Sequence, residues 1–265
     1  MRTREEALKL VGALVADGII APRDLVQFAP HHDNPQDPEA VRQDWEQWYR
    51  GLGIEEVLDR SFTIDPCPFT AAEIEAAESA GELVLCVPRG VGRRELGELV
   101  RLRSWALDDR MVSDTPETED FWFKTPGAAA PQHLGKSAVE VRRQFEDERK
   151  LGFSMERYLV FAARYRHLRG RYPDFRYWTW LLRGRYDRSG MLMVGFDPLG
   201  QLSVHAWMPK FQASFLGCRW IEIPDRLADA VEREPVDAVA AEAQVSGSRE
   251  AAIAGSPAGD GHRSR

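Results

Sequence analysis

The sequence predicts an α+β fold, in which a helical N-terminal region precedes a mixed domain with a mostly antiparallel sheet and packed helices. Three observations support this prediction. Helix-capping patterns recur along the chain, two apolar runs, the second of them alternating with polar residues, flank a Pro/Gly turn at 197–200, and the C-terminal end is rich in Ala, Gly and Ser. We expect a helical region at 1–60, an α+β domain at 61–223 and an acidic, largely disordered tail at 224–265.

Composition excludes several classes of protein. The 265 residues are 43% hydrophobic and 10% aromatic, enough to build a sizeable core. No apolar run approaches the roughly 20 residues of a membrane-spanning helix, so we expect no membrane partner. The 3 cysteines are few and odd in number, which argues against a disulfide framework and predicts a cytoplasmic location.

Two helices are predicted in the N-terminal region. The first begins at Thr3, which has a glutamate three residues later and so matches a capping box. The second begins at Asp37, an N-cap residue followed by proline at the first helical position. Val41, Trp45 and Trp48 place an apolar stripe on this helix. Glycines predict its end near 51–53, and a further turn follows at 54–58.

The middle of the chain alternates between helices and strands. Further capping boxes at Thr70 and Ser137 predict two helix starts. The apolar run Glu82–Val87 stops at a proline and predicts a buried strand. Asp120–Lys124 predicts a second strand, and the Gly90-Val91-Gly92 turn leads into another helix.

The last part of the domain combines a capped helix with several predicted strands. Ser154 caps a helix that we expect to end at Gly170. The run 177–182 fits either a strand or a helix, because its aromatic residues favour a strand but its flanking residues fit helix caps. Strands are predicted at 191–196 and 202–208 around the Pro/Gly turn, and the second strand alternates apolar and polar residues. A further strand is expected at 215–223.

The segment 157–188, here called the Arg/aromatic segment, is the strongest functional signal. It contains nine arginines, two aspartates and nine aromatic residues, whereas the preceding part of the chain is strongly acidic. Interleaved arginine and aromatic side chains suit phosphate contacts and base stacking, as in nucleic-acid binding. They suit a protein interface equally well, since Trp, Tyr and Arg dominate interface energetics. A third reading places these aromatic residues in the core, with the acidic N-terminal region neutralising the arginines.

We interpret the chain as a non-enzymatic binding or adaptor protein that uses an Arg/aromatic surface to bind a protein partner. The binding residues predicted for this surface are Arg164, Arg176, Arg183, Arg185, Trp207 and Arg219. One alternative is a small enzyme that acts on a phosphorylated or anionic ligand. Another is a nucleic-acid-binding protein. No catalytic residue, metal ligand or cofactor is predicted, and the oligomeric state stays open.

Two weaker patterns were considered for phosphate and metal binding. The Gly90-Val91-Gly92 turn between a strand and a helix resembles a phosphate cradle, but Glu95 stands where a dinucleotide fingerprint needs its third glycine. His31-His32-Asp33 offers metal-ligand chemistry without a third or fourth ligand at a suitable spacing, so we expect a solvated loop.

The cysteines carry little functional signal. Cys67, Cys86 and Cys218 lie in or beside apolar runs and have no Cys-x-x-Cys spacing, so we expect buried thiols. A catalytic cysteine–histidine pair stays open, because such partners are commonly distant in sequence. The histidines considered for it are His133, His167 and His205.

Overall fold

The structure, a computed structural model, describes residues 13, 37–113, 117–187 and 190–224. These residues belong to one compact unit that ends at Pro224. The helix predicted to start at Thr3, the His31-His32-Asp33 sequence and the predicted tail beyond Pro224 lie outside the described residues.

The α+β prediction is confirmed. The helices are α3 (Pro38–Leu52), α4 (Ile54–Leu58), α5 (Ala71–Ser79), α6 (Arg93–Leu99), α7 (Trp105–Asp108), α8 (Ala138–Glu148) and α9 (Met155–Arg169). The strands are β1 (Glu82–Val87), β2 (Val112–Ser113), β3 (Phe121–Pro126), β4 (Leu151–Gly152), β5 (Trp178–Tyr186), β6 (Gly190–Phe196), β7 (Leu202–Trp207), β8 (Leu216–Cys218) and β9 (Trp220–Ile221). No described helix has the length and apolar character needed to cross a membrane.

The strands form one larger sheet and two antiparallel pairs. The larger sheet has the order β2-β5-β6-β7, and β8 also pairs with β5. All of its pairings are antiparallel except that between β5 and β8. The strand β1 pairs with β3, and β4 pairs with β9. The predicted predominance of antiparallel pairing is therefore correct.

The predicted caps start the helices as expected. The carboxylate of Asp37 accepts a hydrogen bond from the amide of Ala40 at 2.9 Å, and Pro38 opens α3. Thr70 and Ser137 both form complete capping boxes with the glutamate three residues later. Side-chain oxygens satisfy free amides in the first helical turn, so these local patterns specify the helix starts.

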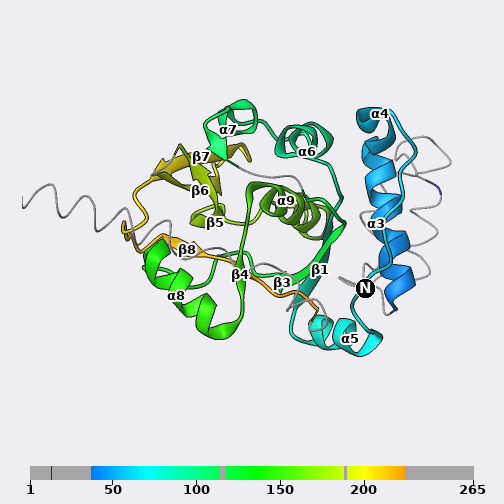
Figure 1. The fold of residues 1–265 in the computed structure, drawn as a ribbon, viewed down its shortest axis with the longest axis horizontal. Helices are drawn as coiled ribbons and strands as arrows, with labels where there is room; N and C mark the ends of the chain where they lie inside the picture. The colour runs from blue at the N-terminus through cyan, green and yellow to red at the C-terminus, as the bar shows by residue number, and fades with distance from the viewer. Residues whose placement is uncertain (1–12, 14–36, 114–116, 188–189, 225–265) are drawn as a thin grey trace, which may run out of the picture. The chain divides into compact units, whose positions relative to one another are not determined.

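Helix α9 lies at the centre of the fold, between the β5-β6-β7 strands and the β1-β3 pair (Figure 1). Most of its side chains are buried, which is typical of a helix covered on several sides. Helix α3 packs into the same hydrophobic core through Trp45 and Tyr49. The Tyr49 hydroxyl donates to the carbonyl of Cys86 at 2.8 Å, and the Trp45 indole donates to the carbonyl of Val84 at 3.2 Å. These two bonds join α3 to β1.

The structure settles one ambiguous prediction and corrects another. The run 177–182 belongs to strand β5, which extends to Tyr186. The single strand predicted at 215–223 is wrong, because the chain forms two short strands, β8 and β9, that pair with different strands. Arg219 lies between them and is fully buried. The chain changes sheets at this residue while its side chain enters the interior.

The β5-β6-β7 strands present two different faces. One face packs against the main core and includes Val204, which is 4% exposed. The other face is covered by α8 only over part of its area, where Trp180 and Met191 are buried. On β7 this second face stays open, so His205 is exposed and Trp207 is 48% exposed. The alternation predicted for this strand is therefore confirmed from Leu202 to Trp207, whereas Met208 lies beyond the strand and is 70% exposed.

We predict that Val204→Asp unfolds the protein while His205→Ala leaves it folded. A carboxylate at position 204 would be buried without a partner and would cost several kcal/mol, a large part of a typical stability of about 5–15 kcal/mol. Soluble yield and thermal melting of both variants measure this difference. Loss of folding in both would mean that the second face of β7 is buried as well.

Candidate functional site

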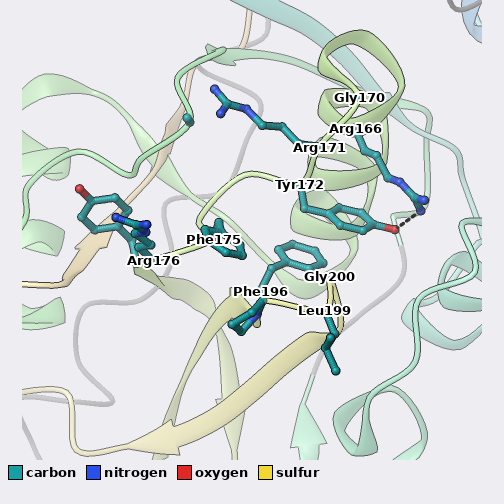
Figure 2. Close-up of a pocket in the computed structure, with 12 residues that line it drawn as sticks. Arg166, Gly170, Arg171, Tyr172, Phe175, Arg176, Phe196, Leu199 and Gly200 are labelled. Carbon is teal, nitrogen blue, oxygen red and sulfur yellow. Dashed lines mark hydrogen bonds between the residues drawn. The ribbon is translucent and has the colours of Figure 1, made fainter.

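A pocket of about 680 Å³ lies between the end of α9, the α9–β5 loop and the β6–β7 turn. Its lining residues are Ala129, Arg166, Gly170, Arg171, Tyr172, Phe175, Arg176, Tyr177, Phe196, Pro198, Leu199 and Gly200. Three are arginines, four are aromatic and none is acidic. We call this site the cationic aromatic pocket (Figure 2).

Local sequence rules position the elements around the pocket. Gly170 ends α9 in the left-handed region at φ 71, where glycine carries no steric cost. The chain then turns through the α9–β5 loop, which supplies most of the arginine and aromatic lining. On the opposite side, the carboxylate of Asp197 accepts hydrogen bonds from the amides of Leu199 and Gln201, both at 2.8 Å. These bonds fix the β6–β7 turn as an Asx-type turn.

Tyr172 and Phe196 form a rigid aromatic wall of the pocket. Their rings are parallel to within 3°, with centroids 4.1 Å apart. The guanidinium of Arg166 lies 4.7 Å from the Tyr172 ring centroid and donates a 2.6 Å hydrogen bond to its hydroxyl. Figure 2 shows this bond beside the stacked rings. The stack and the hydrogen bond hold Arg166 and Tyr172 in place before any ligand binds.

Arg171 and Arg176 differ from Arg166 because no described residue neutralises them. Both are exposed, and neither forms a hydrogen bond or ion pair with any residue that the structure describes. The guanidinium of Arg176 lies 6.0 Å from the ring centroid of Phe175. The pocket therefore offers two available guanidinium groups beside aromatic surface.

The loop that carries these residues is held by the buried carboxylate of Asp174. One of its oxygens accepts hydrogen bonds from the Tyr158 hydroxyl at 2.9 Å, the Thr179 hydroxyl at 2.9 Å and the Arg219 Nε at 3.1 Å. The other accepts from Arg219 Nη2 at 2.6 Å. Asp174 and Arg219 are both fully buried. Burial and the nearby Asp174 charge raise the pKa of Tyr158 well above its usual value, so its hydroxyl stays a donor.

The backbone of Asp174 connects three lining residues. Its amide donates to the carbonyl of Ala129 at 2.8 Å, and its carbonyl accepts from Tyr177 at 3.3 Å and Phe196 at 3.4 Å. Asp174 adopts φ 55, a left-handed conformation that is uncommon for non-glycine residues. Gly195 lets β6 approach this loop, because a Cβ there would lie 2.6 Å from the carbonyl oxygen of Tyr177. Asp174 thus ties together the elements that form the pocket.

The predicted binding residues separate into different environments. Arg176 lines the pocket. Arg164 is buried, forms an ion pair with Asp44 and lies 5.0 Å from the ring centroid of Trp45. Arg219 is buried against Asp174 and donates to the Ala128 carbonyl. Both interior arginines therefore hold parts of the fold together.

The other three predicted residues lie on strands of the larger sheet. Arg183 and Arg185 are half-buried on β5, and Trp207 is half-exposed on β7. None of them lines the pocket. The ring of Trp207 contacts Phe211, with centroids 5.7 Å apart.

Sequence reasoning missed Arg166, Arg171 and Tyr172 as individual site residues. A usable signal was present, since Arg171 and Tyr172 lie between the helix stop at Gly170 and the strand that follows. Residues of such a connection are exposed more often than residues inside a helix or a strand. The contact of Tyr172 with Phe196 across the β6–β7 turn could not be read from the sequence.

The cysteine thiols are poorly placed for nucleophilic catalysis. All three cysteines are buried, and burial raises the pKa of Cys86 and Cys218, which keeps these thiols protonated. In the Gly90-Val91-Gly92 turn, the amide of Gly90 donates a hydrogen bond to the carbonyl of Glu117 at 2.7 Å, so this amide already has a partner within the fold. Among the described residues, no group of three or more His, Cys, Asp or Glu residues could hold a metal ion.

Comparisons with protein-family models, curated proteins and solved structures find no match.

We predict that Asp174→Asn lowers the free energy of unfolding by about 3 kcal/mol or more, because Arg219 would stay buried without its counter-charge. Asparagine tolerates the same backbone conformation, so the change affects mainly the charge. Denaturant-induced unfolding measures the loss.

The matched control for this substitution is Asp187→Asn. Asp187 has φ 53, close to that of Asp174, but it is exposed. We expect its substitution to change stability by no more than about 0.5 kcal/mol. If both substitutions lower the free energy of unfolding equally, the Asp174–Arg219 ion pair does not contribute to stability as predicted.

Proposed function

We propose that this chain is a non-enzymatic binding or adaptor protein whose cationic aromatic pocket receives an anionic group of a protein partner. The observation that carries this proposal is the composition of the pocket. It combines three arginines and four aromatic residues without a single acidic side chain. Two of these arginines, Arg171 and Arg176, form no hydrogen bond or ion pair with any described residue.

The chemistry of these side chains supports recognition of an anion. A guanidinium presents a planar set of N–H donors that matches carboxylate or phosphate oxygens in pairs. Aromatic surface beside it reduces access of water and strengthens the electrostatic attraction. A volume of about 680 Å³ falls within the range of ligand-binding pockets.

The lining of the pocket also supports a polypeptide rather than a small molecule as the partner. Leu199 is 82% exposed and Phe175 is 48% exposed. A small ligand inside the pocket would leave these apolar side chains in water, whereas a longer chain could cover them. Buried aromatic and arginine anchors surrounded by apolar contacts are typical of protein interfaces.

We also propose a cytoplasmic location for the protein. None of the three cysteines forms a disulfide bond. Reduced cysteines are typical of a reducing compartment, whereas secreted proteins commonly join their cysteines in disulfides.

The proposal is tested with a fluorescein-labelled acidic peptide of sequence Glu-Glu-Tyr-Glu-Glu. We predict that the double variant Arg171→Glu/Arg176→Glu weakens binding by at least about tenfold, because each substitution replaces an attractive charge by a repulsive one. Fluorescence anisotropy measures the affinity. An oligothymidylate of similar charge serves as the nucleic-acid arm, with its salt dependence followed.

The control variant is Arg143→Glu, which changes an exposed arginine of α8 that does not line the pocket. We expect it to bind the peptide as the unmodified protein does. If the control loses as much peptide affinity as the double variant, the effect comes from the overall charge of the protein and not from the pocket. Tighter, steeply salt-dependent binding of the oligothymidylate would favour the nucleic-acid alternative instead.

A further inference from the structure

We infer that the anionic group bound by the cationic aromatic pocket is a phosphotyrosine side chain of the partner. This inference rests on the proposed function and specifies the chemistry of its ligand. It combines two properties of the pocket, namely an uncompensated positive charge and an aromatic lining.

The charge of the pocket matches a phosphate better than a carboxylate. The lining carries three guanidinium groups and no acidic side chain. A carboxylate brings one negative charge and two oxygens. A phosphate monoester brings about −1.5 to −2 charges at neutral pH and three acceptor oxygens. The guanidinium of Arg171 or of Arg176 can bind two of those oxygens through its paired N–H groups.

The aromatic lining matches a ring attached to that phosphate. Tyr172 and Phe196 form a preformed stacked wall, and Phe175 and Tyr177 add further aromatic surface. A phenyl ring can stack on or meet these rings edge to face. A phosphoserine side chain has no ring and would leave this aromatic surface without a partner.

Arg166 contributes as a positioning residue. Its guanidinium is already bonded to the Tyr172 hydroxyl at 2.6 Å and lies over the Tyr172 ring. It therefore orients the aromatic wall and adds positive charge nearby. Arg171 and Arg176 are the groups expected to contact the phosphate directly.

The lining also argues against an adenine or cytosine nucleotide as the ligand. Proteins recognise the edges of these two bases by hydrogen bonds, commonly from Asn, Gln, Ser, Thr or acidic side chains. None of these residue types occurs among the lining residues. A phosphotyrosine ring has no polar edge that would need such partners.

The test uses four labelled peptides that are identical except at their central residue, which is phosphotyrosine, tyrosine, phosphoserine or glutamate. We expect the phosphotyrosine peptide to bind at least about tenfold more tightly than each of the other three. Arg171→Ala and Arg176→Ala should each weaken its binding by about tenfold, while Arg143→Ala should not change it. Circular dichroism confirms that each variant is folded.

The pH dependence provides a second measurement. The phosphate loses its second proton at a pKa of about 6, so affinity for the phosphotyrosine peptide should rise between about pH 5 and 7.5. The glutamate peptide is already ionised across this range and should show no such rise.

The possible outcomes separate the inference from the proposed function. If the glutamate or phosphoserine peptide binds as tightly as the phosphotyrosine peptide and depends on the same arginines, the inference is overturned but the proposed function stands. Tighter binding of adenosine monophosphate, measured by competition, overturns the inference in favour of a nucleotide. If no peptide shows binding that depends on Arg171 and Arg176, the proposed function itself fails.

Discussion

The ion pair between Asp174 and Arg219 is the constraint on which the pocket depends. Both side chains are fully buried, so each charge would be costly without the other. The carboxylate also accepts hydrogen bonds from Tyr158 on α9 and Thr179 on β5, while the Asp174 backbone bonds to two other segments, at Ala129 and Phe196. One residue thus joins the central helix, the larger sheet and the loop that carries Arg171 and Arg176. The interruption between β8 and β9 follows from the same pair, because the chain must send Arg219 inward at that point.

The buried arginines and the pocket arginines have different roles because, among the residues that the structure describes, only the buried ones meet carboxylates. Arg164 pairs with Asp44, and Arg157 binds Glu117 at 2.8 Å. Burial lowers the pKa of Arg157 to about 10, which still leaves it charged at neutral pH. The acidic residues that precede the Arg/aromatic segment therefore neutralise part of it, as one reading of the sequence predicts. The loop after α9 keeps Arg171 and Arg176 unpaired among the described residues, and these two arginines give the segment its binding potential.

Features set by local chemistry could be predicted from the sequence, whereas features set by distant partners could not. The caps at Asp37, Thr70 and Ser137 depend on residues three positions apart, and the structure contains all of them. The Asp174–Arg219 pair joins residues 45 positions apart. No local pattern marks Arg219 as an interior residue or divides the strand predicted around it. The Arg/aromatic pattern in the sequence indicated the general region of the site. It could not show which of its residues line the pocket and which lie in the core, because burial depends on the tertiary fold.

The most direct test of this account is amide hydrogen exchange in the Tyr158→Phe variant, which removes one buried hydrogen bond to Asp174. Tyr49→Phe is the matched control, because it removes a buried hydroxyl that bonds to Cys86. A hydrogen bond to a charged group contributes about 1.5–3 kcal/mol, so exchange at the Asp174, Tyr177 and Phe196 amides should accelerate about tenfold or more in Tyr158→Phe alone. Equal exchange at these three amides in the two variants would contradict the claim that Asp174 holds the pocket together.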